Sequence, residues 1–320
     1  MQLAKNTTVQ KFVLLGFSNY LTFQTVLFCA VFLTYIICVL GNITIFLLVK
    51  IESSLHTPMY FFISIFTVLE IMFVSVTVPK LLAILIQTEK TITFFGCFIQ
   101  LYAFNALGET ECFLLSLMVF DRYLAISNPL RYYAIMKPSS YQIVIFGWAC
   151  FQFFIKLSIL PWLFGFSISS FPTVQTFLLD FCGPNEIDHF FCDLAPLQGL
   201  ACSDQFASNL TTVVAAFFSI AAPFFVIVGF YVHIIYTVLR IKSKEGKMKA
   251  FSTCSSHLIV VSLFYGSAII VYLKPKGSHY DKFLALTYTV VTPLLNPFIY
   301  TLRNTEVKIA LRKVARCAIK

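Results

Sequence analysis

Two side chains of opposite charge, Asp121 and Arg122, stand next to each other at the end of an apolar run. Residues 117–120 before them are all apolar, which suits a buried or membrane helix. A charge at bilayer depth is costly unless it is paired or lies at an interface. The two residues could therefore form an ion pair that holds one conformation of a helix bundle and opens in another. The alternative is an arginine that extends its charge to the interface while its neighbour only lowers the desolvation cost.

The chain around this pair carries too little charge for a soluble protein. Of its 320 residues, 59% are hydrophobic and 12% are charged, whereas soluble domains have about 25% charged residues. A soluble protein of this composition could not cover its surface, so the sequence predicts an all-α membrane protein with several spans. Residues 1–20 show no cleavable signal pattern, and we expect the first span to act as the insertion signal.

A bilayer span needs about 20 apolar residues. By this measure the sequence predicts seven spans, at 23–49, 58–86, 95–126, 141–170, 207–239, 250–273 and 283–302. The third is the least obvious by hydropathy because it contains Asn105, Glu109 and Glu111.

Basic residues mark one side of this bundle. Lys and Arg gather in the joints after residues 49, 126 and 239 and in the tail, whereas the joint 171–206 has five acidic residues and no basic one. Because Lys and Arg are enriched in cytoplasmic loops, we expect the N-terminus outside and the C-terminus in the cytosol. The net charge of +9 follows from this distribution and does not indicate a nucleic-acid partner.

Three regions follow from the spans: an extracellular tail at 1–22, the bundle at 23–302, and a cytosolic helix and tail at 303–320. Asn6 begins an Asn-Thr-Thr sequon, a candidate glycosylation site. In the last region apolar and basic residues alternate at helical spacing, which predicts an amphipathic helix on membrane lipid; a solvated helix is the alternative. Cys317 in this region is a candidate for palmitoylation.

Four of the ten cysteines fall on the outer side: Cys97, Cys182, Cys192 and Cys202. In an oxidising compartment they predict two disulfides, for which three connectivities exist. A zinc site at Cys182, His189, Cys192 and Cys202 is the alternative, but its spacing matches no short closed-site pattern.

Several motifs give the chain a family likeness. They are LHTPMYFF at 55–62, DRY at 121–123 with PLRY at 129–132, CGPN at 182–185 with HFFCD at 189–193, KAFSTCSSHL at 249–258, and NPFIY at 296–300 with LRN at 302–304. In this order, and over nearly the whole chain, they resemble the olfactory receptor branch of the rhodopsin-like G-protein-coupled receptors.

The resemblance implies a receptor of the plasma membrane, in olfactory cilia. It would bind small volatile odorants inside the bundle and activate a stimulatory heterotrimeric G protein, which raises cyclic AMP. It implies a conformational switch, formed by Asp121, Arg122, Tyr123, Asn296, Pro297 and Tyr300. In this switch Tyr300 would swing toward Arg122 on activation. It also implies disulfides between Cys97 and Cys192 and between Cys182 and Cys202.

The implied ligand site lies between spans three, five, six and seven. Its residues are Phe104, Asn105, Gly108, Glu109 and Cys112 on span three, and Tyr265, Ala268, Ile269 and Tyr272 on span six. Any one of the aromatic residues could instead be interhelical packing. Glu109 is unusual, since the branch has an uncharged residue there. It is either an ionised counter-ion for an amine ligand, or a group that is protonated or turned toward a neighbouring helix and then says nothing about the class of ligand.

The likeness also implies a polar centre formed by Asn42, Glu70 and Asn296, with Glu111 facing the same cavity. Two carboxylates at mid-membrane depth cannot both stay ionised without a cation or a shared proton. We therefore expect a sodium ion or a proton at Glu70 and Glu111, linked to the inactive state; no other cofactor is expected. A purely structural hydrogen-bonded pair is the alternative.

The chain departs from the family around span four. Trp148 takes the place of the family's tryptophan when counting forward from Asp121, and Trp162 takes it when counting back from Cys182. The 14-residue difference corresponds to about four helical turns. Residues 141–181 are too few for two spans and a turn. We expect one span with an extension or a surface segment, interrupted near Lys156.

Two other classes of function compete with a receptor. An ion- or proton-coupled transporter or channel would use Glu70, Glu109 and Glu111 as a relay, but transporters usually show internal repeats and paired broken helices, which we do not find. A membrane enzyme lacks support because the sequence has no His-Glu-x-x-His or Gly-x-Ser-x-Gly motif. The sequence favours a receptor that is not an enzyme.

Overall fold

The computed structural model describes residues 9–128, 132, 143–273 and 281–318. Asn6, the predicted glycosylation site, lies outside this part of the chain. So do the side chains of Ile269, Tyr272, Trp148 and Cys317, although their backbones are helical.

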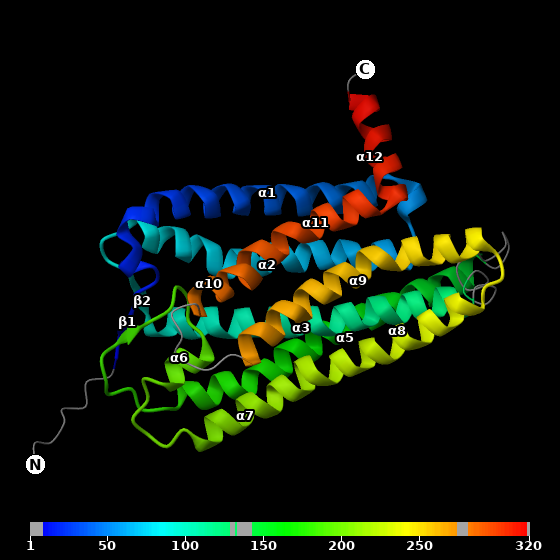
Figure 1. Ribbon diagram of the computed structural model, residues 1–320. Helices are drawn as coiled ribbons and strands as arrows, with labels where there is room; N and C mark the ends of the chain where they lie inside the picture. Colours follow the sequence, from blue (N-terminus) through cyan, green and yellow to red (C-terminus); the bar gives the residue numbers. More distant parts are fainter. Residues whose placement is uncertain (1–8, 129–131, 133–142, 274–280, 319–320) are drawn as a thin grey trace, which may run out of the picture.

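Seven long helical segments run side by side in the described part of the chain (Figure 1). The first four are α1 (Gln24–Ile51), α2 (Pro58–Ile86), α3 (Phe94–Ser127) and α5 (Ile143–Phe177). The fifth joins α7 (Phe206–Ala216), the π-helical η3 (Phe217–Ala221) and α8 (Ala222–Arg240). The sixth is α9 (Lys244–Leu273), and the seventh joins α10 (Asp281–Leu286), the π-helical η4 (Thr287–Val291) and α11 (Thr292–Arg303).

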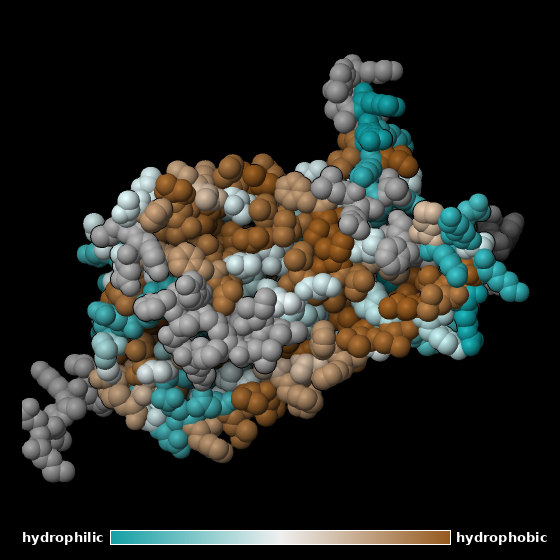
Figure 2. Space-filling view, in the orientation of Figure 1, coloured by the Kyte–Doolittle hydropathy of each residue, from teal (hydrophilic) through white to brown (hydrophobic). Residues whose placement is uncertain are grey.

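The helices are long and apolar enough to cross a membrane. Among the described residues six segments meet this criterion, and α9 adds a shorter apolar stretch at Cys254–Ala268. The chain is therefore a multi-pass membrane protein with a seven-helix bundle, as predicted. Figure 2 shows hydrophobic side chains along the flank of the bundle and hydrophilic ones gathered toward its ends.

The prediction of an interruption near Lys156 is wrong. Helix α5 is continuous over 35 residues and contains Pro161 and Pro172. At about 1.5 Å per residue it is about 52 Å long, so it exceeds the ~30 Å hydrocarbon core. Lys156 is exposed, and an exposed lysine can extend its amine toward the interface without breaking the helix. The excess residues are thus accommodated as additional helix.

A small sheet covers the outer end of the bundle. Its strands are β1 (Lys11–Leu14), β2 (Thr91–Thr93) and β3 (Glu186–Ile187), in the order β2-β1-β3. The central strand β1 is antiparallel to β2 and parallel to β3. Phe12 and Leu14, on one face of β1, are fully buried. The sequence predicted only a tail here, so the strand is an addition to the prediction.

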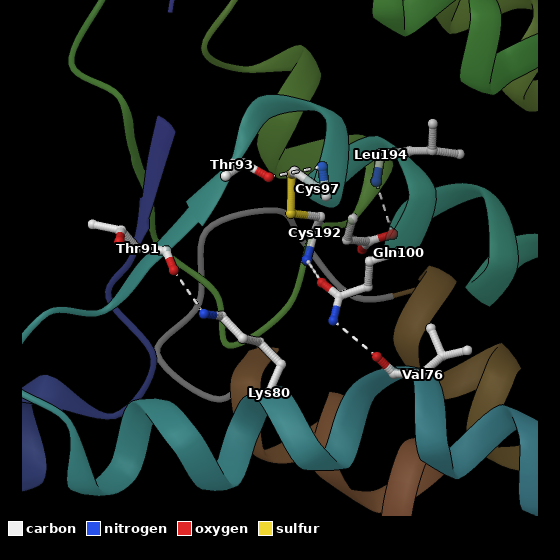
Figure 3. The surroundings of a disulfide bond; sticks show 10 residues. Val76, Lys80, Thr91, Thr93, Cys97, Gln100, Cys192 and Leu194 are labelled. Carbon is white, nitrogen blue, oxygen red and sulfur yellow. Dashed lines mark hydrogen bonds between the residues drawn. A yellow bond between two sulfur atoms is a disulfide. The ribbon is translucent and has the colours of Figure 1, made fainter. Parts of the chain in front are cut away.

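Two disulfides hold the outer loop, one of them to the bundle and one within the loop. Cys97 of α3 is bonded to Cys192, with their Cα atoms 5.5 Å apart, and Cys182 is bonded to Cys202. This is the pairing that the family resemblance implies, and it leaves the four thiols unavailable for the alternative zinc site. Figure 3 shows the first disulfide beside Gln100. The Gln100 Oε1 atom accepts a hydrogen bond from the Cys192 amide at 3.0 Å.

At the inner end the chain turns sharply out of the bundle. Helix α12 (Thr305–Ala318) leaves α11 at a steep angle (Figure 1). Its basic residue Lys313 forms an ion pair with Glu52, with 2.9 Å between Nζ and Oε2. The hydrogen bond from Lys313 lowers the pKa of Glu52 below its ordinary value. Glu52 follows α1, so this contact holds α12 against the inner end of the first helix.

Candidate functional site

The charged pair at the inner end of α3 is buried and closed. The Arg122 Nη2 atom lies 2.5 Å from Asp121 Oδ2, and Nε donates to the same oxygen at 3.1 Å. The exposed fractions are 8% for Arg122 and 2% for Asp121. A guanidinium group that is this buried and is bonded to a carboxylate does not extend to the membrane interface. The geometry therefore favours the ion pair over the interfacial arginine.

Tyr132, which was not among the residues expected at this site, forms a hydrogen bond with the Asp121 carboxylate of the pair. The Tyr132 hydroxyl donates a hydrogen bond to Asp121 Oδ1 at 2.9 Å. Asp121 thus accepts hydrogen bonds on both carboxylate oxygens. Tyr132 lies within the PLRY motif, but the motif gives no indication of a contact eleven residues back along the chain.

The other predicted switch residues lie on neighbouring helices. Tyr123 packs its ring against Phe230 and His233 of α8. Tyr300 is buried and meets the ring of Phe66 edge-on, with centroids 5.9 Å apart. In this conformation Tyr300 packs toward α2, and its swing toward Arg122 remains a prediction.

Pro297 marks a close approach between the first and seventh helices. A Cβ atom added to Gly41 of α1 would lie 3.1 Å from the Pro297 Cβ atom. Proline has no backbone N–H and interrupts the hydrogen-bond ladder of a helix. The interruption in α11 therefore falls directly beside Asn296, which belongs to the polar centre.

The polar centre brings three of its predicted members together. Asn296 Nδ2 donates to Glu70 Oε1, and Glu111 is a hydrogen-bonding neighbour of Glu70. All three side chains are buried. Glu70 Oε2 and Asn296 Oδ1 have no hydrogen-bond partner among the described residues. Asn42 was predicted to join this group but instead donates to the carbonyl of Cys38 on its own helix, at 3.0 Å.

Part of the predicted ligand wall faces α2, the outer loop and the seventh helix. The Phe104 ring contacts Phe73 of α2, Phe191 of the outer loop and Tyr288 of η4. Gly108 lies against Phe73, since a Cβ atom there would meet its ring at 3.6 Å.

Deeper in the same wall, α3 meets the sixth helix. The Cys112 thiol lies beside the Tyr265 hydroxyl on α9. Ala268 is half-buried on the same helix. These residues line the interior of the bundle, as expected from helical spacing.

The Glu109 side chain does not face this wall; it points toward α5 and η3. Its carboxyl group neighbours the Ser219 hydroxyl of η3 and the backbone of Ser169 in α5. Its Oε2 atom and the Asn105 Nδ2 atom have no partner in the described part of the chain. Of the two interpretations of Glu109, the geometry favours the group turned toward neighbouring helices.

The outer loop contains a further acid, the half-buried Asp193. It begins the short helix α6 (Leu194–Gln198), where its Oδ1 atom accepts a hydrogen bond from the Leu194 amide at 2.8 Å. Burial raises the pKa of Asp193 above its ordinary value, and this hydrogen bond opposes the rise. Asp193 caps a helix, and the structure places it next to the Cys97–Cys192 disulfide.

Seven spans, a closed charged pair at the inner end and a disulfide-bound outer loop define a seven-helix receptor of the rhodopsin-like class. Residues 28–317 match the family model described as olfactory receptor. The chain therefore belongs to the olfactory receptor family, whose members are receptors and not enzymes.

Curated relatives cover the same length. Human olfactory receptor 2C3 is 46% identical over 315 residues, which are 98% of this chain and 94% of the relative. Human olfactory receptor 6N1 is 46% identical over 311 residues, 95% of each chain. Mouse olfactory receptor 6E1 is 44% identical over 315 residues, 97% of this chain and 96% of the relative.

Proposed function

We propose that this protein is an odorant receptor of the plasma membrane of olfactory cilia. It binds small volatile molecules inside the bundle and activates a stimulatory heterotrimeric G protein, which raises cyclic AMP. The observation that carries the proposal is the closed Asp121–Arg122 pair at the inner end of α3, in a chain of the olfactory receptor family. A ligand that binds better to the conformation with this pair open shifts the population toward it.

The test is cyclic AMP production in transfected cells against a broad panel of volatile compounds, with surface labelling of the N-terminus in the same wells. We expect a dose-dependent rise that Arg122→Ala abolishes at equal surface level. Lys11→Ala, which removes an exposed positive charge at the outer end, is the matched control and should leave the response intact. A response that survives Arg122→Ala would contradict the assigned role of the pair.

We further propose that Glu70, Glu111 and Asn296 hold a sodium ion or a shared proton in the inactive conformation. The donor set fits a hard cation, which prefers oxygen ligands. Glu70 Oε2 and Asn296 Oδ1 are two buried oxygens without a partner among the described residues. A bound cation would offset the charge of the carboxyl pair and keep the residues of α2, α3 and α11 together.

A further inference from the structure

A groove with a volume of about 630 Å³ opens on the outside of the bundle between α5 and α7. Phe164 and Phe171 of α5 form one wall and Leu210 and Phe218 of the fifth segment form the other; all four are exposed. The floor is Phe113 of α3 with Ala215 of α7, which is buried. Since these helices cross the membrane, the groove opens toward lipid.

The side chains that line the groove are apolar apart from one threonine, and that threonine already has hydrogen-bond partners on its own helix. Thr211 is the only polar member of the lining, and its hydroxyl lies within hydrogen-bonding distance of the Ala207 and Ser208 carbonyls of its own helix. A polar head group would therefore find no partner along the groove. An alkyl chain or another apolar group suits it.

A polar cluster lies beside the groove, on the same helices. Residues four apart on a helix share a face. Glu109 precedes the floor residue Phe113 by four positions, and Ser219 follows the floor residue Ala215 by four. Ser219 donates a hydrogen bond to the Ala215 carbonyl at 2.7 Å, and its hydroxyl neighbours the Glu109 carboxyl.

The wall formed by α5 leads to the same cluster. Ile168 of α5 lines the groove, and the next residue, Ser169, contributes backbone to the surroundings of Glu109. Each of the three helices that form the groove therefore carries one residue of the Glu109 cluster beside a lining residue or one helical turn from it. The Glu109 carboxyl group lies behind the lining, on the same three helices.

This carboxyl group has unused hydrogen-bonding capacity. Its Oε2 atom is buried and has no partner among the residues that the structure describes. A buried polar atom without a partner costs free energy, so a ligand that supplies the missing hydrogen bond is favoured. A hydroxyl group fits either protonation state, because it donates to a carboxylate and accepts from a carboxylic acid. An amine fits only the ionised acid, which is the costlier form in an apolar environment.

The side chains beneath the sheet at the outer end are closely packed. Phe12, Leu14 and Phe17 beneath the sheet are at most 2% exposed, and Phe17 stacks on Phe190 of the outer loop. The groove, in contrast, is open along the side of the bundle. A molecule dissolved in the bilayer can therefore enter the groove from the side, next to the helices that carry the Glu109 cluster.

We propose that the groove and Glu109 form a binding site, entered from the bilayer, for amphiphiles with a short alkyl chain and a single hydroxyl group. The chain lies against Phe113, Phe164 and Phe218, and the hydroxyl group binds Glu109. This site is separate from the interior wall around Tyr265. It does not depend on coupling to a G protein.

The test uses the purified full-length receptor in phosphatidylcholine nanodiscs and a photoactivatable probe, octanol carrying a diazirine. After illumination, peptide mapping locates the label. We expect it on the groove-lining parts of α5 and α7, displaced by unlabelled octanol. Octane, which lacks the hydroxyl group, should displace it at least about tenfold less well, the contribution of one hydrogen bond to a charged or buried group.

Variants separate the two parts of the site. Ala215→Phe fills the floor and Glu109→Leu removes the polar contact, so each should lower the labelling about tenfold. Val213→Phe adds the same ring at an exposed position outside the groove, and Glu109→Gln keeps a donor and an acceptor; both should label like the parent. Thermal unfolding checks that each variant is folded.

Equal displacement by octane and octanol would overturn the proposal, as would unchanged labelling of Ala215→Phe; either result means that the groove holds lipid chains alone. The octane comparison needs no variant and decides the matter even if Glu109→Leu does not fold. Labelling requires no G protein, so a silent cyclic AMP assay leaves this result unaffected.

Discussion

The Asp121 carboxylate accepts hydrogen bonds from two directions, from Arg122 on its own helix and from Tyr132 beyond the end of α3. The tyrosine holds the carboxylate in the orientation in which it binds the guanidinium. Its hydroxyl group therefore stabilises the closed pair, although it never touches Arg122.

Tyr132→Phe should raise ligand-free activity. A hydrogen bond to a charged group contributes about 1.5–3 kcal/mol, and about 1.4 kcal/mol is a factor of ten in an equilibrium. We expect the equilibrium to shift by about tenfold or more toward the open pair, measured as a rise in basal cyclic AMP at matched surface level. Tyr35→Phe, which removes a hydroxyl bonded to Ser75 at 3.0 Å, is the control. Equal basal activity in the two variants would refute the role of Tyr132.

The polar centre gives a second prediction at this scale. If a sodium ion binds Glu70 and Glu111 in the inactive conformation, replacing sodium by a bulky organic cation should shift odorant dose-response curves to lower concentration. Allosteric couplings are typically about 5- to 150-fold. Glu70→Gln and Glu111→Gln should each abolish the shift. Glu306→Gln, at an exposed carboxylate on α12, should keep it, and the idea fails if all three variants respond like the parent.

Helices α3 and α5 approach each other closely at a glycine of α5, Gly165. A Cβ atom on Gly165 would lie 2.3 Å from Thr110 Oγ1 and 2.7 Å from the Ala106 carbonyl. Small residues let membrane helices pack backbone to backbone. This contact fixes the long helix α5 against the helix that carries both Glu111 and Arg122.

Gly165→Ala should therefore weaken the bundle. Overpacking typically costs about 1–3 kcal/mol, so we expect a lower unfolding temperature in detergent and less receptor at the cell surface. Gly229→Ala is the matched control, because a Cβ atom there meets nothing within 4 Å in the described structure. If both alanine variants unfold at the same temperature, Gly165 is not the tight contact that the geometry indicates.

The attachment of α12 is also testable at the scale of an element. Because the pKa of Glu52 is lowered in the folded protein, the stabilisation from its contact with Lys313 is present above the ordinary carboxyl pKa of about 4.3. It is lost only as the pH falls through the lowered value. Hydrogen exchange of α12 should thus be insensitive to pH changes near neutrality. High salt or Lys313→Met should speed it, whereas Lys308→Met should not.

At the scale of the whole molecule, the spans could be predicted because their cause is local. An apolar run of sufficient length must cross the bilayer, and the predicted range of α2, 58–86, matches the helix found. Strand β1 could not be predicted in this way, since four residues form a strand only through partners at Thr91–Thr93 and Glu186–Ile187. Likewise, the direction of Glu109 depends on how α3 is rotated against α5 and η3, which helical spacing alone does not determine.

The disulfides connect these distant parts, and their loops differ greatly in length. The sequence separation is 95 residues for Cys97–Cys192 and 20 residues for Cys182–Cys202. For a chain that unfolds completely, loop-closure entropy gives stabilisations of about 4.7 and about 3.3 kcal/mol. The longer loop, however, contains most of α3 and all of α5, and membrane helices retain their backbone hydrogen bonds in lipid. With this bond broken, the unfolded chain therefore has less conformational freedom than the loop-closure calculation assumes, and the bond stabilises the receptor by less than about 4.7 kcal/mol.

We accordingly expect removal of either bond to destabilise the receptor by a similar amount. Cys97→Ser/Cys192→Ser and Cys182→Ser/Cys202→Ser should both lower the unfolding temperature of the purified protein, and a reducing agent should bring the parent to the lower of the two values. Cys29→Ser, at an exposed free thiol, should have no effect. A much larger loss for the 95-residue loop would mean that α3 and α5 separate on unfolding, so that the bundle and the outer loop unfold as one cooperative unit.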